Sequence, residues 1–163
     1  MKVLGLDPGT TATGWGIVVF EEGRLRLEGC GVWRPRAALA LAGKLGFLFD
    51  RAEALLQDCE PDAISVETIF AGKNIASALK LAHARGALML AAARRSLPVF
   101  EYEPRLVKKA LVGYGQAEKH QVRAMVLSLL ARQRSRVPLD AADALALAIC
   151  HIHAAPAGGT SRQ

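Results

Sequence analysis

The sequence is poor in cysteine and in aromatic side chains, and it has no long apolar run. Its 163 residues include only three cysteines, and Phe, Trp and Tyr together make up 6%. Three widely spaced cysteines (Cys30, Cys59 and Cys150) do not form a disulfide framework, so we expect reduced thiols in the core of a cytosolic protein. No stretch reaches the roughly 18 apolar residues of a membrane span. The start, MKVLGLDPG, lacks the apolar segment of a secretory signal, which favours a soluble, intracellular protein.

Low-complexity linkers and internal repeats are also lacking. The hydrophobic share of 52% is too high for a disordered chain, and the length suits one compact domain better than two. A domain of this size buries roughly 70% of its unfolded surface, so it needs no metal or disulfide for stability. We therefore expect a single domain over residues 1–157, with residues 158–163 as a disordered tail.

Acidic residues are scarce in the second half of the chain. Residues 1–70 carry 7 Lys and Arg against 10 Asp and Glu, whereas residues 71–163 carry 14 against 5. The net charges of −3 and +9 give the total of +6. Such a basic half suits a polyanion such as nucleic acid, because each neutralised phosphate releases counterions. Solvated helix faces rich in arginine would produce the same charge, so both interpretations remain open.

The hydrophobic pattern predicts an α/β domain. Three apolar runs joined by turns indicate an antiparallel meander, and the remaining segments alternate between helical and extended patterns. The predicted strands are 2–6, 16–20, 25–33, 63–67 and 98–102, and the predicted helices are 39–59, 74–95, 104–113, 117–132 and 138–153. The order βββαβαβααα predicts a five-stranded mixed sheet, a meander followed by βαβ crossovers, flanked by helices.

Four carboxylates could share a metal site. Asp7 and Glu67 each end an apolar strand, and they meet if the first and fourth strands are adjacent. Asp140 and Asp143 are spaced i,i+3 and so lie on one face of the last helix. The local sequence offers these four no basic partner, so they would repel one another unless a divalent cation joined them.

Oxygen ligands of this kind select Mg²⁺ or Mn²⁺, and two ions about 4 Å apart suit phosphodiester hydrolysis. Each carboxylate taken singly has another interpretation. Asp7 precedes Pro-Gly and suits a turn, Glu67 suits a solvated strand end, and Asp140 suits the first turn of a helix because of its dipole. Their joint placement favours the metal site.

Four long segments resemble the RuvC family of bacterial Holliday junction resolvases. In the order of the family and over nearly the whole chain, they are LGLDPGTTATGWG, ISVETIFAGKNIASALKLAHARG, PVFEYEPRLVKKALVGYGQAEKHQV and PLDAADALALAICH. The resemblance implies a ribonuclease H-like fold and a homodimer that nicks two opposed strands of a four-way DNA junction with Mg²⁺. It also implies a role in homologous recombination and DNA repair beside the RuvA and RuvB branch-migration proteins.

The resemblance also implies roles for individual residues. Asp7, Glu67, Asp140 and Asp143 match the family's acidic catalytic and metal-binding residues, although some relatives have His at the last position. Phe70 matches an aromatic residue that contacts unstacked bases, where stacking is worth roughly 1–3 kcal/mol per base; a core Phe is the alternative. Lys108 and Lys119 match basic residues that the family uses on DNA near the scissile site. Further candidates for phosphate contacts are Lys73, Arg85, Lys109 and Arg123, for which a solvated helix face is the alternative.

Three other functions compete with a resolvase. DPGTTATGWG resembles the phosphate-binding turn of the actin and hexokinase ATPases, but those enzymes need two lobes and this chain supplies one. A small ribonuclease H-like protein of the YqgF type shares the DPG-like start but not the later segments. A junction-binding module without catalysis would not need all four carboxylates. For the dimer, we expect the 74–95 helix to contribute, because Ala76, Ala82 and Gly86 permit close approach.

Overall fold

A computed structural model describes residues 1–69, 74–131 and 136–155 of the chain. The predictions made for Phe70, Lys73 and the 158–163 tail lie outside these residues. The elements are β1 (Lys2–Asp7), β2 (Thr13–Glu21), β3 (Arg24–Trp33), α1 (Leu41–Cys59), β4 (Ala63–Glu67), α2 (Ile75–Arg94), β5 (Val99–Tyr102), α3 (Pro104–Val112), α4 (Lys119–Leu129) and α5 (Leu139–Ala154). Their order is the predicted one, and the bounds differ from the predicted ranges by a few residues.

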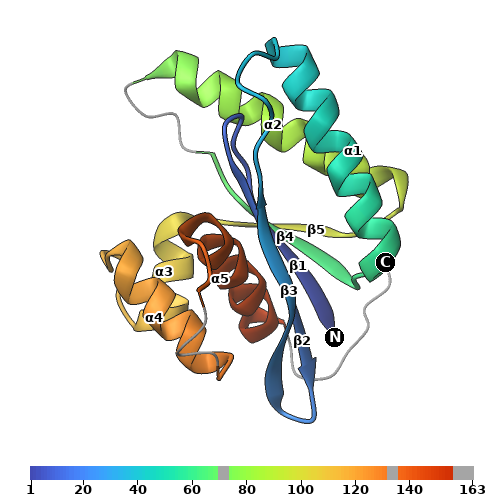
Figure 1. The fold of residues 1–163 in the computed structure, drawn as a ribbon. Helices are drawn as coiled ribbons and strands as arrows, with labels where there is room; N and C mark the ends of the chain where they lie inside the picture. Colours follow the sequence, from blue (N-terminus) through green and yellow to red (C-terminus); the bar gives the residue numbers. More distant parts are fainter. Residues whose placement is uncertain (70–73, 132–135, 156–163) are drawn as a thin grey trace.

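The five strands form one mixed sheet in the order β3-β2-β1-β4-β5. Strands β1, β2 and β3 pair antiparallel, while β4 pairs parallel with both β1 and β5. This is the predicted meander with crossovers. Helices α1 and α2 cover one face of the sheet, and α3, α4 and α5 cover the other (Figure 1).

Alternation along the strands divides the core into two layers. Leu4, Leu6 and Ile17 pack towards α1 and α2, whereas Val3 and Val18 pack towards α5. Because successive side chains of a strand point to opposite faces, the odd-numbered positions of β1 face α5. Asp7 therefore ends β1 on the face that α5 covers.

Glycines bring α5 unusually close to the sheet. A Cβ added at Gly5 would lie 1.8 Å from the carbonyl oxygen of Ala144, and one added at Gly14 would lie 1.9 Å from that of Asp140. Only glycine leaves space for these approaches. In the buried layer between α5 and the sheet, the Ser65 hydroxyl of β4 donates a hydrogen bond of 2.8 Å to the carbonyl oxygen of Leu147. These contacts fix the position of α5 on the strands that carry Asp7 and Glu67.

Helix α2 leaves an apolar stripe uncovered. Ile75, Leu79 and Leu90 are 71%, 55% and 56% exposed, while the helix buries a different face through Ala84 and Leu88. The spacing of apolar residues pointed to the side of α2 that carries Ile75, Leu79 and Leu90, but the side with Ala84 and Leu88 packs on the domain.

The three cysteines are free thiols, as predicted. Cys59 and Cys150 are buried and Cys30 is half-buried. Burial raises the pKa of Cys59 and Cys150 to about 11, which favours the neutral thiol over the reactive thiolate. Among the described helices, none is long and apolar enough to span a membrane.

Candidate active site

The carboxyl ends of β1 and β4 place two carboxylates side by side. The two strands are parallel and adjacent, with Leu6 paired to Val66, so Asp7 and Glu67 follow at the same edge of the sheet. Both side chains lie on the α5 face, because Gly5 and Ser65, two residues earlier, also contact α5. The adjacency on which the sequence-based hypothesis depended is therefore present.

The turn after Asp7 is held by the hydroxyl of Thr13, the first residue of β2. The buried Thr13 hydroxyl donates to the carbonyl oxygen of Gly9 at 2.7 Å and accepts from the Gly9 N–H at 3.2 Å. This pair of bonds closes the Gly- and Thr-rich turn into the start of β2. The backbone that follows Asp7 at the end of β1 is therefore held in place.

Helix α5 brings the remaining carboxylates to this edge. Asp143 lines a cavity of about 300 Å³ together with Asp7 and Glu67. The cavity wall is completed by Pro104, Val107, Lys108, Lys119, Val122, Ala146 and Leu147. Asp140, one turn earlier on α5, lies outside the cavity, yet it is near enough to raise the pKa of Asp7. The structure therefore gathers three predicted residues around one cavity and places the fourth beside it.

Burial and clustered negative charge together make the carboxyl groups of the site harder to ionise. Burial, followed by the charges of Glu67 and Asp143, raises the pKa of Asp7 from 3.8 to about 7. Burial and Asp143 also raise the pKa of Glu67, while Lys119 and Lys108 act in the opposite direction. Carboxyl groups that resist ionisation in this way mark a place where positive charge is deficient.

Two cations from distant parts of the chain offset the α5 carboxylates. The Lys119 ammonium donates to Asp143 Oδ2 at 2.7 Å, and Arg34 Nη2 lies 3.4 Å from Asp140 Oδ2. Local sequence gave no signal of either pair. Within the described residues, neither Asp7 nor Glu67 has an ion-pair partner. The site therefore keeps two carboxylates that a divalent ion could neutralise.

The donor set fits a hard cation, although its groups are not arranged as a finished ligand shell. In the described part of the chain, no three carboxylates, imidazoles or thiols surround a common point closely enough to hold an ion. Oxygen donors without a thiol or imidazole suit Mg²⁺ or Mn²⁺. The raised pKa of Asp7 fits the same interpretation, because a cation in the cavity would relieve the repulsion.

Comparison with known proteins agrees with this geometry. The sequence model of the family described as crossover junction endodeoxyribonuclease RuvC matches residues 3–151. The chain belongs to the RuvC family. It is 49% identical to the RuvC protein of Paramagnetospirillum magneticum, over 94% of this chain and 92% of the relative. It is 44% identical to the RuvC protein of a Roseiflexus species, over 95% of this chain and 92% of the relative.

Solved structures of the RuvC family have the same fold. Thermus thermophilus RuvC is 34% identical, with a TM-score of 0.85 and 93% of each chain covered. The same protein in complex with a Holliday junction substrate gives a TM-score of 0.87. The yeast mitochondrial Holliday junction resolvase Ydc2, 16% identical, shares the fold with a TM-score of 0.65 over 91% of this chain and 76% of that one. The fold is thus the predicted ribonuclease H-like one.

The other basic residues singled out by the RuvC resemblance occupy different settings. Lys108 lines the cavity, whereas its neighbour Lys109 is exposed and lies outside the cavity lining. Arg85 is largely buried and pairs with Glu101 of β5, which ties α2 to the edge of the sheet. Its role on DNA stays a prediction, and the ion pair gives it a structural role as well.

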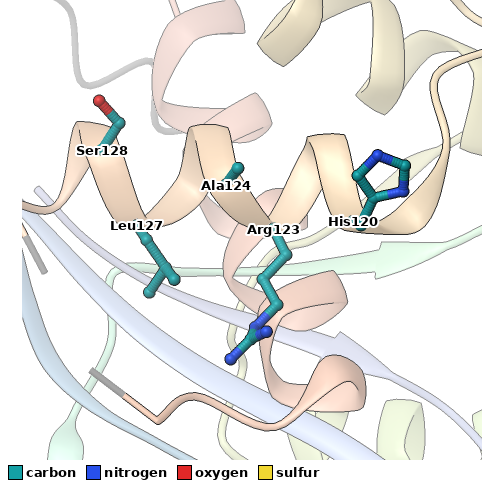
Figure 2. A pocket seen from close by; sticks show the side chains of 5 residues that line it. All are labelled: His120, Arg123, Ala124, Leu127 and Ser128. Atoms are coloured by element: carbon teal, nitrogen blue, oxygen red, sulfur yellow. The ribbon is translucent and has the colours of Figure 1, made fainter. Parts of the chain in front are cut away.

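Arg123 belongs to a second hollow, of about 350 Å³, along α4. Its Nε donates to the carbonyl oxygen of Val137 at 3.0 Å, which anchors the segment that leads into α5. Figure 2 shows Arg123 and Leu127 pointing in the same direction from α4, with His120, Ala124 and Ser128 completing the lining of the hollow. None of the described residues that line this hollow is a carboxylate, so it lacks the groups of the α5 site.

Sequence reasoning missed a contact between α5 and β5. The hydroxyl of Tyr102 lies 2.8 Å from Nδ1 of the buried His151, and the backbone carbonyl of Tyr102 accepts from the Thr68 N–H at 3.0 Å. Thr68 follows Glu67 directly. The two aromatic residues of β5, Phe100 and Tyr102, and the histidine on α5 were the available signal, but hydrophobic periodicity does not pair elements that are distant in the sequence.

Proposed function

We propose that this chain is a Holliday junction resolvase, an endonuclease that makes paired nicks in opposed strands of a four-way DNA junction by metal-assisted hydrolysis. The observation that carries the proposal is the cavity next to the carboxyl ends of β1 and β4. There Asp7, Glu67 and Asp143 meet Lys108 and Lys119 in a chain of the RuvC family. The Thermus thermophilus relative, described in complex with a Holliday junction substrate, supports the choice of substrate.

Asp7, Glu67, Asp140 and Asp143 are the proposed metal ligands and catalytic residues. Bound Mg²⁺, or Mn²⁺ in its place, would supply a more acidic water and neutralise charge at the leaving oxygen, for which two ions per site are suited. Asp7 and Glu67 contribute carboxylates from two paired strand ends, and neither has an ion-pair partner among the described residues. As a metal ligand, Asp143 would give up its bond from Lys119, and that ammonium would then be free to contact a phosphate.

The DNA is held by positive charge next to these acids. Lys108 and Lys119 face the cavity and so can contact the phosphates that flank the scissile bond. Arg85, Lys109 and Arg123 remain proposed outer contacts. Phe70 is proposed to stack on an unpaired base, on the strength of the family resemblance. Lys73 is proposed as a further phosphate contact because it is a basic residue in the same segment.

Two symmetric cuts require two sites, which a homodimer supplies. The exposed stripe of Ile75, Leu79 and Leu90 on α2 supports this proposal, because such side chains are normally covered. Gly86 has nothing within 4 Å of an added Cβ, so another helix can approach there. By family resemblance we also propose that RuvA and RuvB are partners and that the protein acts at the nucleoid in the bacterial cytoplasm, in recombination and repair.

The function can be tested on a labelled synthetic four-way junction with Mg²⁺. We expect paired nicks at symmetric positions in opposed strands, none in a linear duplex of the same sequence, and none in EDTA. Asp7→Asn should bind the junction without cutting it. ATP hydrolysis without nicking would instead support the phosphate-transfer alternative, and tight junction binding without nicking by the wild-type protein would support the binding module.

A further inference from the structure

Arg34 follows β3 at the same sheet edge as the carboxylates. In the antiparallel meander Thr13 pairs with Trp33 and Gly14 with Asp7, so the end of β3 lies at the carboxyl end of β1. Arg34 is exposed, but it stands between two buried residues, Trp33 and Pro35. The backbone that carries the guanidinium is therefore anchored, while the side chain itself is mostly exposed to solvent.

The Arg34 side chain points towards the acidic site. Its Nη2 lies 3.4 Å from Asp140 Oδ2, and the arginine side chain is 61% exposed. An exposed pair at that distance adds little to stability, so stability alone does not account for an arginine in this place. On the opposite side of the site, Lys119 pairs in the same way with Asp143. The two pairs together give Asp140 and Asp143 one exposed cation each.

We propose that Arg34 is a substrate-binding residue that contacts a DNA phosphate on the β3 side of the active site, and that Asp140 holds it in place until metal and DNA arrive. The inference rests on the proposed function and deepens it. A divalent ion at Asp140 competes with the guanidinium for the same carboxylate. The released guanidinium then has a phosphate as its neighbour, to which it can donate two parallel hydrogen bonds.

The proposal extends the DNA-binding surface beyond the basic half of the chain. Lys108 and Lys119 lie on α3 and α4, next to β4 and α5. Arg34 directly follows β3, which lies beyond β2 at the other edge of the sheet. Neighbouring strands are about 4.8 Å apart, so a backbone that crosses from β4 to β3 passes cations on both sides of the acids.

The test compares Arg34→Ala with Arg36→Ala, a matched loss of an exposed arginine two residues away. Mn²⁺ binding to the DNA-free protein is titrated first. Because Arg34 competes with the ion for Asp140, we expect Arg34→Ala to bind Mn²⁺ about two- to five-fold more tightly, and Arg36→Ala to match wild type. Thermal unfolding of each variant checks that the fold is intact.

The affinity for the junction is then measured as a function of salt concentration in the presence of Ca²⁺ in place of Mg²⁺. A denaturing gel confirms that the junction stays uncut. Loss of one phosphate contact should weaken binding and reduce the slope of log affinity against log salt by about one. Arg34→Lys should restore most of the slope because it restores the charge. Tighter Mn²⁺ binding together with weaker junction binding is a combination that simple unfolding does not produce.

The inference is overturned if Arg34→Ala and Arg36→Ala behave alike in both titrations, or if Arg34→Ala loses Mn²⁺ and junction affinity together with a lower unfolding temperature. Failure of the proposed function is a separate result, because it shows as a wild-type protein that does not nick the junction in Mg²⁺. In that case the Mn²⁺ titration still tests whether Arg34 and the ion compete for Asp140.

Discussion

Gly14 of β2 lies directly beneath the backbone carbonyl of Asp140, so closely that a Cβ on Gly14 would stand 1.9 Å from the oxygen. Asp140 is in the first turn of α5, and Asp143 is one turn further on. The absence of a side chain at one strand position thus sets the distance between the α5 carboxylates and Asp7, the partner of Gly14 in the sheet.

Gly14→Ala should therefore displace the start of α5. We expect a loss of about 1–3 kcal/mol in the free energy of unfolding, as for other overpacked cores, and a larger fall in nicking because Asp140 and Asp143 move. Urea unfolding and junction nicking measure the two effects. Gly46→Ala on α1 is the control: nothing lies within 4 Å of its added Cβ, and it should stabilise the helix by about 0.5–1 kcal/mol. Equal stability of the two variants would contradict the close approach.

Asp7→Asn should stabilise the metal-free protein at alkaline pH. The pKa of Asp7 rises from 3.8 to about 7 on folding, so the native state resists losing this proton. Stability from this group is complete below about pH 4 and is lost as pH rises to 7. In EDTA at pH 8 we expect a gain on the order of 2 kcal/mol for Asp7→Asn, which disappears near pH 4. Urea unfolding at both pH values, with the exposed Asp50→Asn as control, measures it; destabilisation at pH 8 would show that Asp7 has a structural role.

Nicking should rise with pH through about 7 when Mg²⁺ is limiting. Asp7 must lose its proton to bind a cation, and its pKa is about 7 without one. Because metal and proton compete, a higher Mg²⁺ concentration should move the midpoint to lower pH. Single-turnover rates at two Mg²⁺ concentrations, from pH 5.5 to 8.5, test this. A midpoint that stays fixed while Mg²⁺ changes would assign the titration to another group.

Leu79→Glu should separate the proposed homodimer into monomers. The substitution places a charge in the middle of the exposed stripe of α2, where Leu79 is 55% exposed and Leu90 is 56% exposed. Sedimentation should report a halved mass, and junction nicks should become single and unpaired. Leu106→Glu is the control, because Leu106 is similarly exposed (51%) but lies on α3, outside this stripe. A dimer that survives Leu79→Glu would place the interface elsewhere.

The hydrophobic pattern alone predicted the order of the elements and the mixed sheet. Strand alternation and helical spacing are local properties, so they can be recognised within each segment. They also placed Asp7 and Glu67 at strand ends and Asp140 and Asp143 on one helix face. The side of α2 that packs on the domain was not predictable in this way: the helix carries apolar residues on two sides, and the side with Ala84 and Leu88 fits the space beside α1.

The sequence by itself determined which carboxylates could form the site, because their positions follow from local periodicity and from turns. Only the tertiary structure decided which cations face them. Lys119 meets Asp143 across 24 positions, and Arg34 meets Asp140 across 106. The four acids had no basic partner in their local sequence, and among the residues that the structure describes the fold supplies two. Such pairs depend on how β3, α4 and α5 pack around the sheet, and no local pattern encodes that packing.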